Sequence, residues 1–244
     1  MKILISQKAP SNLSAYSALE EKYGVGLEFK PFFVIEPLSA KEFRSQRINL
    51  PDYTAIVFSS RHAIDAYFQL CEQMRFKVPE TMKYFCSTEL VALYLQKHVV
   101  YRKRKIFFGE GTPQSIVAQI GPKHRGEKFL ITTSDESKAT TLTSLFDKMG
   151  LDYAVSVMVK SVAQDLTGLN LSEYGALVLY NPYDLESLRK SFPEFRPNGT
   201  AIISYGRSIA EALEKDGMAI AVKGGPNTEI PSAAKAIEVF LSSR

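Results

Sequence analysis

The chain has 244 residues, of which 45% are hydrophobic and 23% are charged, and its formal net charge is +4. This composition is typical of a globular protein and excludes disordered, collagen-like and coiled-coil classes. No apolar run approaches the roughly 20 residues that a membrane helix needs, and the apolar run at residues 3–5 is too short for a signal peptide. We therefore expect a cytoplasmic protein with no membrane partner, and a monomer as the default state.

Residue types that hold metals or catalyse group transfer are sparse. Cys71 and Cys86 are too few for a disulfide framework or a four-ligand zinc site. His62, His98 and His124 have no carboxylate or second histidine at metal-ligand spacing. The glycine-rich phosphate motifs, the metalloprotease helix motif and the nucleophile-elbow motif are absent from the sequence. These observations disfavour a structural metal, nucleotide-dependent chemistry and triad-type catalysis.

The first half of the sequence resembles the second half. Four segments recur in the same order: residues 2–6 with 128–132, 19–24 with 145–150, 53–58 with 174–179, and 85–88 with 205–208. Chance similarity of α/β patterns can explain one or two such matches. Four in order indicate a duplicated unit of about 120 residues, as in other repeat architectures.

Within each half, short apolar runs alternate with amphipathic segments. The short runs are typical of strands buried on both faces, and the alternation predicts a parallel sheet wound by helices on both sides. In chain order the predicted strands and helices are strand 3–5, helix 11–23, strand 53–58, helix 63–74, strand 129–131, strand 177–180, helix 185–192, strand 201–204 and helix 208–215.

Two further extended segments, residues 30–36 and 155–162, each follow the first strand and helix of a half. If both cross between domains, the first domain is discontinuous. We therefore predict two flavodoxin-like parallel-sheet α/β domains joined by a two-stranded linker. Their predicted bounds are 1–34 plus 163–244 for domain 1, 40–155 for domain 2, and 35–39 and 156–162 for the linker strands.

Ligands of open α/β sheets bind beyond the carboxyl ends of the strands, where free backbone N–H groups at helix N-termini favour anions. Almost every predicted strand-to-helix turn carries a hydroxyl or amide side chain, although helix capping selects the same residue types and is an equally good explanation for any single turn. Two arginines just inside helix N-termini oppose the helix dipole, which suggests anion binding, with a solvated side chain as the alternative. The candidate binding residues are Ser59, Ser60, Arg61, Ser87, Thr88, Ser134, Asn181, Arg207 and Ser208.

Residues 102–105 form a basic run, Arg-Lys-Arg-Lys, with Tyr101 and Phe107 beside it. Such a run is capable of contacting nucleic acid or another partner. Because no nucleic-acid-binding motif accompanies it, we favour a solvated loop and expect no nucleic-acid partner.

Three segments resemble the motifs of one enzyme family. Residues 56–66, Ile-Val-Phe-Ser-Ser-Arg-His-Ala-Ile-Asp-Ala, resemble the "FTSxxAV" segment of uroporphyrinogen-III synthases. Residues 202–217 resemble the family's "aIGxxTAxaLxxxG" segment, and residues 2–6 resemble its "iLvTR" opening. Each motif alone is weak, but their order and spacing extend the resemblance over nearly the whole chain.

The resemblance implies two α/β domains with the active site in the cleft between them. It implies a cyclising hydro-lyase of tetrapyrrole biosynthesis that acts on hydroxymethylbilane, a linear tetrapyrrole with eight carboxylates. The enzyme removes the terminal hydroxyl as water and closes the ring with the last pyrrole inverted. No cofactor is implied, and hydroxymethylbilane synthase is the candidate protein partner.

The sequence departs from the family pattern at site positions. Met158 stands where the family carries a tyrosine held to assist departure of the hydroxyl, and a thioether cannot donate a proton. Gln7 replaces the opening arginine, and Tyr180-Asn181 replaces the second Thr-Ser pair. Tyr180 is our candidate catalytic residue, because its phenol can supply the missing donor; a packed aromatic side chain at a turn is the alternative.

These departures leave two other functions open. The first is a catalytically impaired relative that binds a tetrapyrrole or another polycarboxylate in the same cleft. The second is a two-lobed sensor of an unrelated small molecule.

Overall fold

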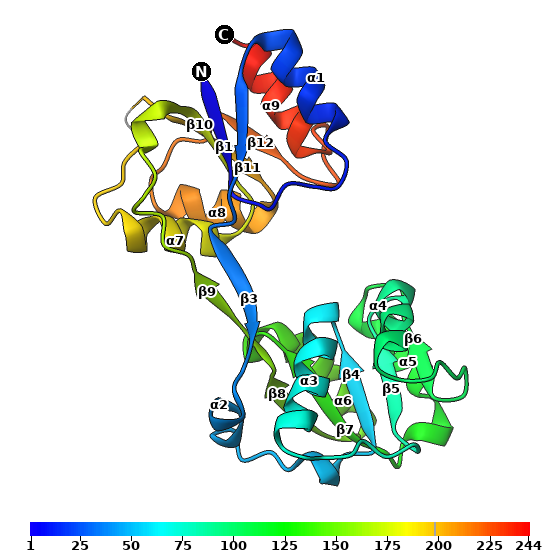
Figure 1. The fold of residues 1–244 in the computed structure, drawn as a ribbon. Helices are drawn as coiled ribbons and strands as arrows, with labels where there is room; N and C mark the ends of the chain where they lie inside the picture. The colour runs from blue at the N-terminus through cyan, green and yellow to red at the C-terminus, as the bar shows by residue number, and fades with distance from the viewer. Residues whose placement is uncertain (198) are drawn as a thin grey trace. The chain divides into compact units, whose positions relative to one another are not determined.

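The computed structural model describes residues 1–197 and 199–244 and divides the chain into two compact units. Unit 1 comprises Met1–Val34 and Val162–Arg244, and unit 2 comprises Ile35–Ser161. Strands alternate with helices in each unit, and the main sheet of each is parallel throughout (Figure 1). The α/β fold with two parallel sheets is therefore confirmed. No helix of the described residues is long and apolar enough to cross a membrane.

The sheet of unit 1 has the order β12-β11-β10-β1-β2. Counted along unit 1, this is the order 2-1-3-4-5 of flavodoxin-like folds, read from the opposite edge. The strands are β1 (Lys2–Ile5), β2 (Gly26–Phe29), β10 (Tyr174–Leu179), β11 (Ala201–Tyr205) and β12 (Val222–Gly224).

Helices cover both faces of this sheet, and successive strand residues pack on opposite sides. Figure 1 shows α1 beside α9 over one face and α7 with α8 over the other. Ile3 and Ile5 pack in the cluster under α1 and α9, whereas Leu4 packs in the cluster under α7 and α8. The helices are α1 (Ser14–Tyr23), α7 (Pro182–Ser191), α8 (Arg207–Lys215) and α9 (Ala233–Ser242).

The sheet of unit 2 has the order β6-β5-β4-β7-β8. Counted along unit 2, this is the order 3-2-1-4-5, because the two strands β7 and β8 come last in the unit rather than first. One face packs on α3 and α4 and the other on α5 and α6. The strands are β4 (Ala55–Phe58), β5 (Lys83–Cys86), β6 (Ile106–Phe108), β7 (Lys128–Thr133) and β8 (Asp152–Val157). The helices are α2 (Ala40–Arg44), α3 (Arg61–Gln73), α4 (Glu89–Tyr94), α5 (Pro113–Ile120) and α6 (Thr140–Met149).

The duplicated sequence halves do not coincide with the compact units. The sequence matches pair β1 with β7, β10 with β4, and β11 with β5. Unit 1 therefore takes β1 and β2 from the first half and β10 to β12 from the second, while unit 2 takes β4 to β6 from the first half and β7 and β8 from the second. Each sheet is built from both halves, joined by the parallel pairs β1–β10 and β4–β7.

The chain passes between the units along β3 (Phe33–Pro37) and β9 (Val159–Ala163), which form a separate two-stranded sheet. Backbone hydrogen bonds flank this pair, from Leu38 N to Met158 O (2.9 Å) and from Gln164 N to Phe32 O (2.8 Å). The segment 155–162, predicted as one extended strand, is instead divided at Met158. Residues up to Val157 belong to β8, in the sheet of unit 2.

Helix boundaries differ from the predictions by a few residues. The helix predicted at 11–23 begins at Ser14, because the Asn12 side chain accepts a hydrogen bond from Ser14 N (2.9 Å). It ends as expected at Gly24, whose φ of 64° is left-handed. The helix predicted at 63–74 begins at Arg61, since Ser60 accepts a hydrogen bond from Ala63 N (3.2 Å).

Leu130 lies on β7, at the seam between the two halves of the sheet in unit 2, and has no solvent exposure. We expect Leu130→Ala to lower the free energy of unfolding by about 2–5 kcal/mol, through lost apolar burial and the cavity that remains. Leu90→Ala is the matched control, because Leu90 is 65% exposed, and we expect it to change stability by less than about 0.5 kcal/mol. Urea denaturation followed by circular dichroism measures both, and equal shifts would contradict this placement of Leu130.

Candidate functional site

In unit 2, three neighbouring strands end in turns that carry candidate residues. Ser59 and Ser60 follow β4, Ser87 and Thr88 follow β5, and Ser134 follows β7. Because β5, β4 and β7 are adjacent and parallel, these turns lie beside one another at the carboxyl edge of the sheet. The structure thus brings together the hydroxyl residues that the sequence predicted in unit 2.

A network of hydrogen bonds joins these turns. The Ser87 hydroxyl donates to Ser59 O (3.1 Å), and Ser87 N donates to Phe58 O (2.9 Å). On the other side of β4, the Thr132 hydroxyl donates to Val57 O (2.7 Å). The bonds fix the turns through backbone atoms and hold the edge in one arrangement.

Two of these residues, Ser60 and Thr88, cap helices, as the capping interpretation predicts. Ser60 Oγ accepts from Ala63 N (3.2 Å), and Thr88 Oγ1 accepts from Val91 N (3.3 Å). A hydroxyl that accepts a backbone hydrogen bond still carries a proton to donate. Capping and ligand binding are therefore compatible at these positions.

Arg61 begins α3, where a cation opposes the helix dipole. Its side chain is exposed, and its guanidinium lies over the Tyr94 ring, 5.4 Å from the centroid. Within the described residues no carboxylate forms an ion pair with Arg61. The nearby Asp65 pairs instead with Lys97 (2.9 Å). Arg61 is thus a charged group at the carboxyl edge that is available to an anion.

Unit 1 presents a second carboxyl edge, formed by the turns after β1, β10 and β11. Asn181 caps α7, because its side-chain oxygen accepts from Tyr183 N (3.1 Å). Gly206 begins the turn into α8 with a φ of 131°, a conformation that favours glycine. A Cβ at Gly206 would lie 3.3 Å from Tyr180 O, so the turns after β10 and β11 are in close contact.

A buried carboxyl group, Asp184, fastens this edge. Asp184 Oδ2 accepts hydrogen bonds from Ser6 Oγ (2.7 Å), Tyr180 N (2.8 Å) and Asn181 N (3.0 Å). The residue is 1% exposed, and its Oδ1 has no hydrogen-bond partner among the described residues. Burial disfavours the charged form and raises the pKa of Asp184, although these three hydrogen bonds oppose the shift.

Tyr180 lies at the carboxyl end of β10, half buried among aromatic side chains. Its ring packs edge-on against Tyr205, with the centroids 5.5 Å apart. Burial, with the hydroxyl of Tyr16 beside it, raises the pKa of Tyr180 well above the usual phenol value. The side chain therefore keeps its proton at neutral pH and is able to donate a hydrogen bond, but it is a weaker acid than a solvated tyrosine.

The remaining candidates in unit 1 lie at the start of α8. Arg207 is exposed, and its Nε donates to Glu211 Oε1 one turn along the same helix (2.7 Å). Ser208 is exposed beside it. Unlike Arg61, Arg207 has a carboxylate partner, which an anionic ligand would have to displace.

The side chains at the altered family positions differ in burial. Met158, in the place of the family tyrosine, is 2% exposed and packs in the core of unit 2. Gln7 is exposed beyond the end of β1. Cys86 is buried, and burial raises the pKa of its thiol to about 12. No group of three or more His, Cys, Asp or Glu residues in the described parts of the chain is arranged to hold a metal ion.

Asp184 is not among the candidate residues predicted from the sequence. A signal was present, because Asn181-Pro182-Tyr183-Asp184 has the spacing of a capping box, with proline at the first helical position. The same signal would have moved the predicted start of this helix from residue 185 to Pro182.

Comparison with known proteins identifies a family. The model of the family described as Uroporphyrinogen-III synthase HemD matches residues 14–229. A uroporphyrinogen-III synthetase structure from Helicobacter pylori is 17% identical with a TM-score of 0.57, covering 100% of this chain and 99% of that one. A mutant uroporphyrinogen III synthase from Thermus thermophilus is 14% identical with a TM-score of 0.54 and full coverage of both chains. These two structures share the fold. No curated protein matches the chain significantly.

Asp184→Asn keeps the shape of the side chain and removes the titrating carboxyl. Because burial raises the pKa of Asp184, the folded protein binds more protons than the unfolded chain and loses stability as the pH rises through the folded pKa. The amide does not titrate. We therefore expect the melting temperature of Asp184→Asn, relative to the parent, to rise as the pH increases from about 4 to about 7.

Thermal denaturation at a series of pH values tests this. Asp135→Asn is the control. Hydrogen bonds from Ser137 lower the pKa of the partly exposed Asp135, so the relative melting temperature of this variant should not rise over the same range. A flat or falling difference for Asp184→Asn would contradict the raised pKa.

Proposed function

The chain belongs to the uroporphyrinogen-III synthase family, and we propose that it catalyses the reaction that gives the family its name. In this reaction the C–O bond of the terminal hydroxymethyl group of hydroxymethylbilane breaks and water leaves. The last pyrrole ring is inverted as the macrocycle closes. The chain would thus act as a cyclising lyase without a cofactor, on a substrate supplied by hydroxymethylbilane synthase.

The observation that carries this proposal is the family match over residues 14–229. The carboxyl edges give it physical support, since the proposed substrate has eight carboxylates and these edges offer hydroxyls, an amide and helix N-termini. A hydrogen bond to a charged group contributes about 1.5–3 kcal/mol, and a helix terminus about 0.3–1 kcal/mol. Contacts of this size suffice collectively without an arginine cluster.

We propose that substrate carboxylates bind at carboxyl-edge turns, for which each unit offers its own donors. In unit 2 the main donors are the hydroxyl protons of Ser60 and Thr88 and the guanidinium of Arg61, which pairs with no carboxylate of the described residues. In unit 1 the first turn of α8, which has no side-chain cap, supplies backbone N–H groups. The other candidates, whose part is to complete this polar lining, are Ser59, Ser87, Ser134, Asn181, Arg207 and Ser208.

Catalysis then rests mainly on conformation. The leaving hydroxyl departs from a carbon whose cation the adjacent pyrrole stabilises, so the chemical step needs little acid assistance. Folding the flexible chain so that its two ends meet is the larger entropic demand, and a binding surface that fixes several carboxylates meets it. The protein's main task is to orient the substrate.

We propose that Tyr180 assists the hydroxyl by donating a hydrogen bond as it leaves as water. Its position beside the turn that Asp184 fastens supports this role, as does the raised pKa, which keeps the phenol protonated at neutral pH. Met158 has no proton to give and is buried in the core. The presence of Met158 in the place of the family tyrosine also supports the second candidate function. This is an impaired relative that binds a tetrapyrrole or another polycarboxylate without turnover.

A coupled assay with porphobilinogen and hydroxymethylbilane synthase separates the two functions. We expect the chain to yield the type III isomer above the spontaneous type I background, because an oriented substrate closes with the last ring inverted. Type I product alone would contradict the synthase. If quenching of the protein's tyrosine fluorescence or calorimetry still shows that the tetrapyrrole binds, the result supports the impaired relative. No binding would contradict both.

Tyr180→Phe removes the proposed donor and leaves the ring in place. We expect turnover of hydroxymethylbilane to fall by about 10- to 100-fold, at the low end for proton-transfer assistance, with a smaller change in KM. Tyr153→Phe is the matched control, because the Tyr153 hydroxyl bonds Asp147 (2.8 Å) at the surface of unit 2. Equal turnover in Tyr180→Phe and Tyr153→Phe would exclude Tyr180 from catalysis.

A further inference from the structure

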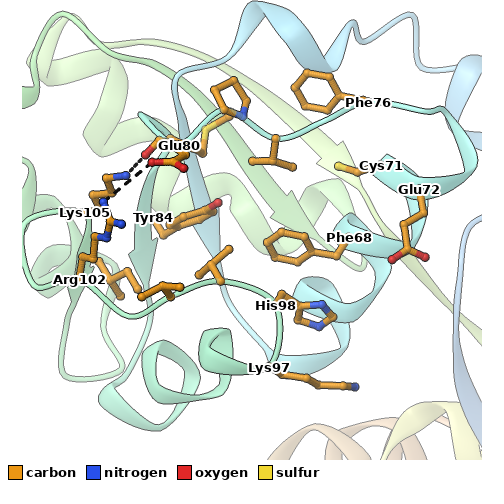
Figure 2. Close-up of a pocket in the computed structure, with 16 residues that line it drawn as sticks. Phe68, Cys71, Glu72, Phe76, Glu80, Tyr84, Lys97, His98, Arg102 and Lys105 are labelled. Carbon is orange, nitrogen blue, oxygen red and sulfur yellow. Dashed lines mark hydrogen bonds and ion pairs between the residues drawn. The ribbon is translucent and has the colours of Figure 1, made fainter.

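Unit 2 contains a cavity of about 510 Å³ at the edge of its sheet opposite the candidate site. Its lining comes from α3, from the loops that lead into β5 and β6, and from the first residues of those strands (Figure 2). Ligand pockets of proteins typically have volumes of about 300–1,000 Å³. Neither the family motifs nor the carboxyl-edge turns contribute a candidate binding residue to this cavity.

The interior of the cavity is apolar and aromatic. Phe68 and Phe76 line it together with Met82, Val99 and Ile106. The ring of His98 stacks on Phe68, with the centroids 4.5 Å apart and the planes 3° from parallel. A flat, apolar group would therefore meet a lining rich in aromatic and aliphatic side chains.

The Tyr84 hydroxyl faces the cavity without a partner among the residues that the structure describes. Tyr84 is 3% exposed, and its ring packs against Phe58 and Phe68. Its hydroxyl makes no hydrogen bond to any described residue, and Figure 2 shows it directed toward the middle of the cavity. The hydroxyl oxygen is open to the cavity rather than sealed in the core, so water or a ligand atom is able to reach it. The Tyr84 hydroxyl is therefore positioned to bind a polar atom of a ligand.

The rim of the cavity is basic on the side of the run at residues 102–105. Arg102 and Lys105 line it, and a neighbouring hollow that shares both residues adds Lys83 and Arg104. Glu80 is the acidic residue common to both hollows; it is 4.0 Å from Arg102 and largely exposed. Lys105 donates to the Glu80 carbonyl rather than to a carboxylate. The cations at this rim thus outnumber their carboxylate partner.

The opposite rim has no surplus of positive charge, because the Glu72 carboxylate lies on that side and Lys97 pairs with Asp65. Lys97 and His98 both bond Asp65 Oδ1, at 2.9 Å and 2.8 Å, and the Tyr94 hydroxyl bonds its other oxygen (2.7 Å). Any attraction for an anion therefore comes from the Arg102 and Lys105 side.

We propose that this cavity binds a small aromatic organic anion. The apolar body lies among the rings of Phe68 and Phe76, a polar atom accepts the Tyr84 hydroxyl proton, and a carboxylate or sulfonate pairs with Arg102 and Lys105. This site goes beyond the proposed synthase function, because it lies at the amino edge of the sheet and shares no residue with the candidate site. The basic run, favoured as a solvated loop in the sequence, is on this account part of a binding site.

Two fluorescent probes of matched shape test the proposal. 8-Anilinonaphthalene-1-sulfonate carries the anion, and N-phenyl-1-naphthylamine has the same rings without it. We expect the folded full-length chain to bind the sulfonate at least about tenfold more tightly, the effect of one ionic hydrogen bond. Equal affinities for the two probes would overturn the proposal.

Variants locate the bound probe. We expect Arg102→Gln and Lys105→Gln each to weaken binding of the sulfonate about threefold to tenfold, and Tyr84→Phe to weaken it similarly through loss of one hydrogen bond. Lys103→Gln is the matched control, since Lys103 has the same charge in the same run but does not line the cavity. If Lys103→Gln weakens binding as much as Arg102→Gln, or Tyr84→Phe has no effect, the proposal is wrong.

A single reporter provides a second measurement. The chain contains no tryptophan, so Phe76→Trp places one indole in the cavity lining. We expect the sulfonate probe to quench the tryptophan emission. The dissociation constant from this quenching should equal the one from the fluorescence of the probe. A tryptophan that does not respond while the probe binds would show that the anion binds elsewhere, which contradicts the proposal.

Discussion

The parallel pairing of strands that lie far apart in the sequence is the interaction on which the rest of the structure depends. β1 pairs with β10, with Leu4 opposite Leu177, and β4 pairs with β7, with Ile56 opposite Leu130. Parallel neighbours end at the same edge of a sheet. Within each sheet, the pair therefore brings turns from different halves of the sequence to the same edge. The pairing determines which hydroxyls become neighbours there.

The two units secure this seam with different chemistry at equivalent positions. In unit 2 the Thr132 hydroxyl donates to a backbone carbonyl of β4, Val57 O. In unit 1 the equivalent Ser6 donates to the carboxyl of Asp184, which also accepts two backbone N–H groups. The carboxyl joins β1 to the turn that carries Tyr180 and Asn181. The position of the candidate catalytic residue thus depends on a buried acidic group, whereas unit 2 needs only a backbone acceptor.

Much of the fold was predictable because buried parallel strands are short apolar runs. Residues 3–5 and 129–131 lie within β1 and β7, and the repeat matches correctly paired the strands of the two halves. The division of residues 155–162 at Met158 was not predictable, since both β8 and β9 are extended and apolar. The turns of the candidate site followed from topology alone. The partners of Asp184 and the cavity around Tyr84 depend on packing between segments distant in sequence, which no local pattern records.

The exchange of strands between halves is tested most directly by hydrogen exchange in a Leu177→Ala variant. Leu177 is fully buried on β10, beside β1. The structure predicts that the substitution accelerates amide exchange in residues 2–5, more than 160 residues away in sequence, and leaves residues 128–133 at the parent rate. Faster exchange in residues 128–133 with residues 2–5 unchanged would mean that each half folds on its own, and would contradict the account.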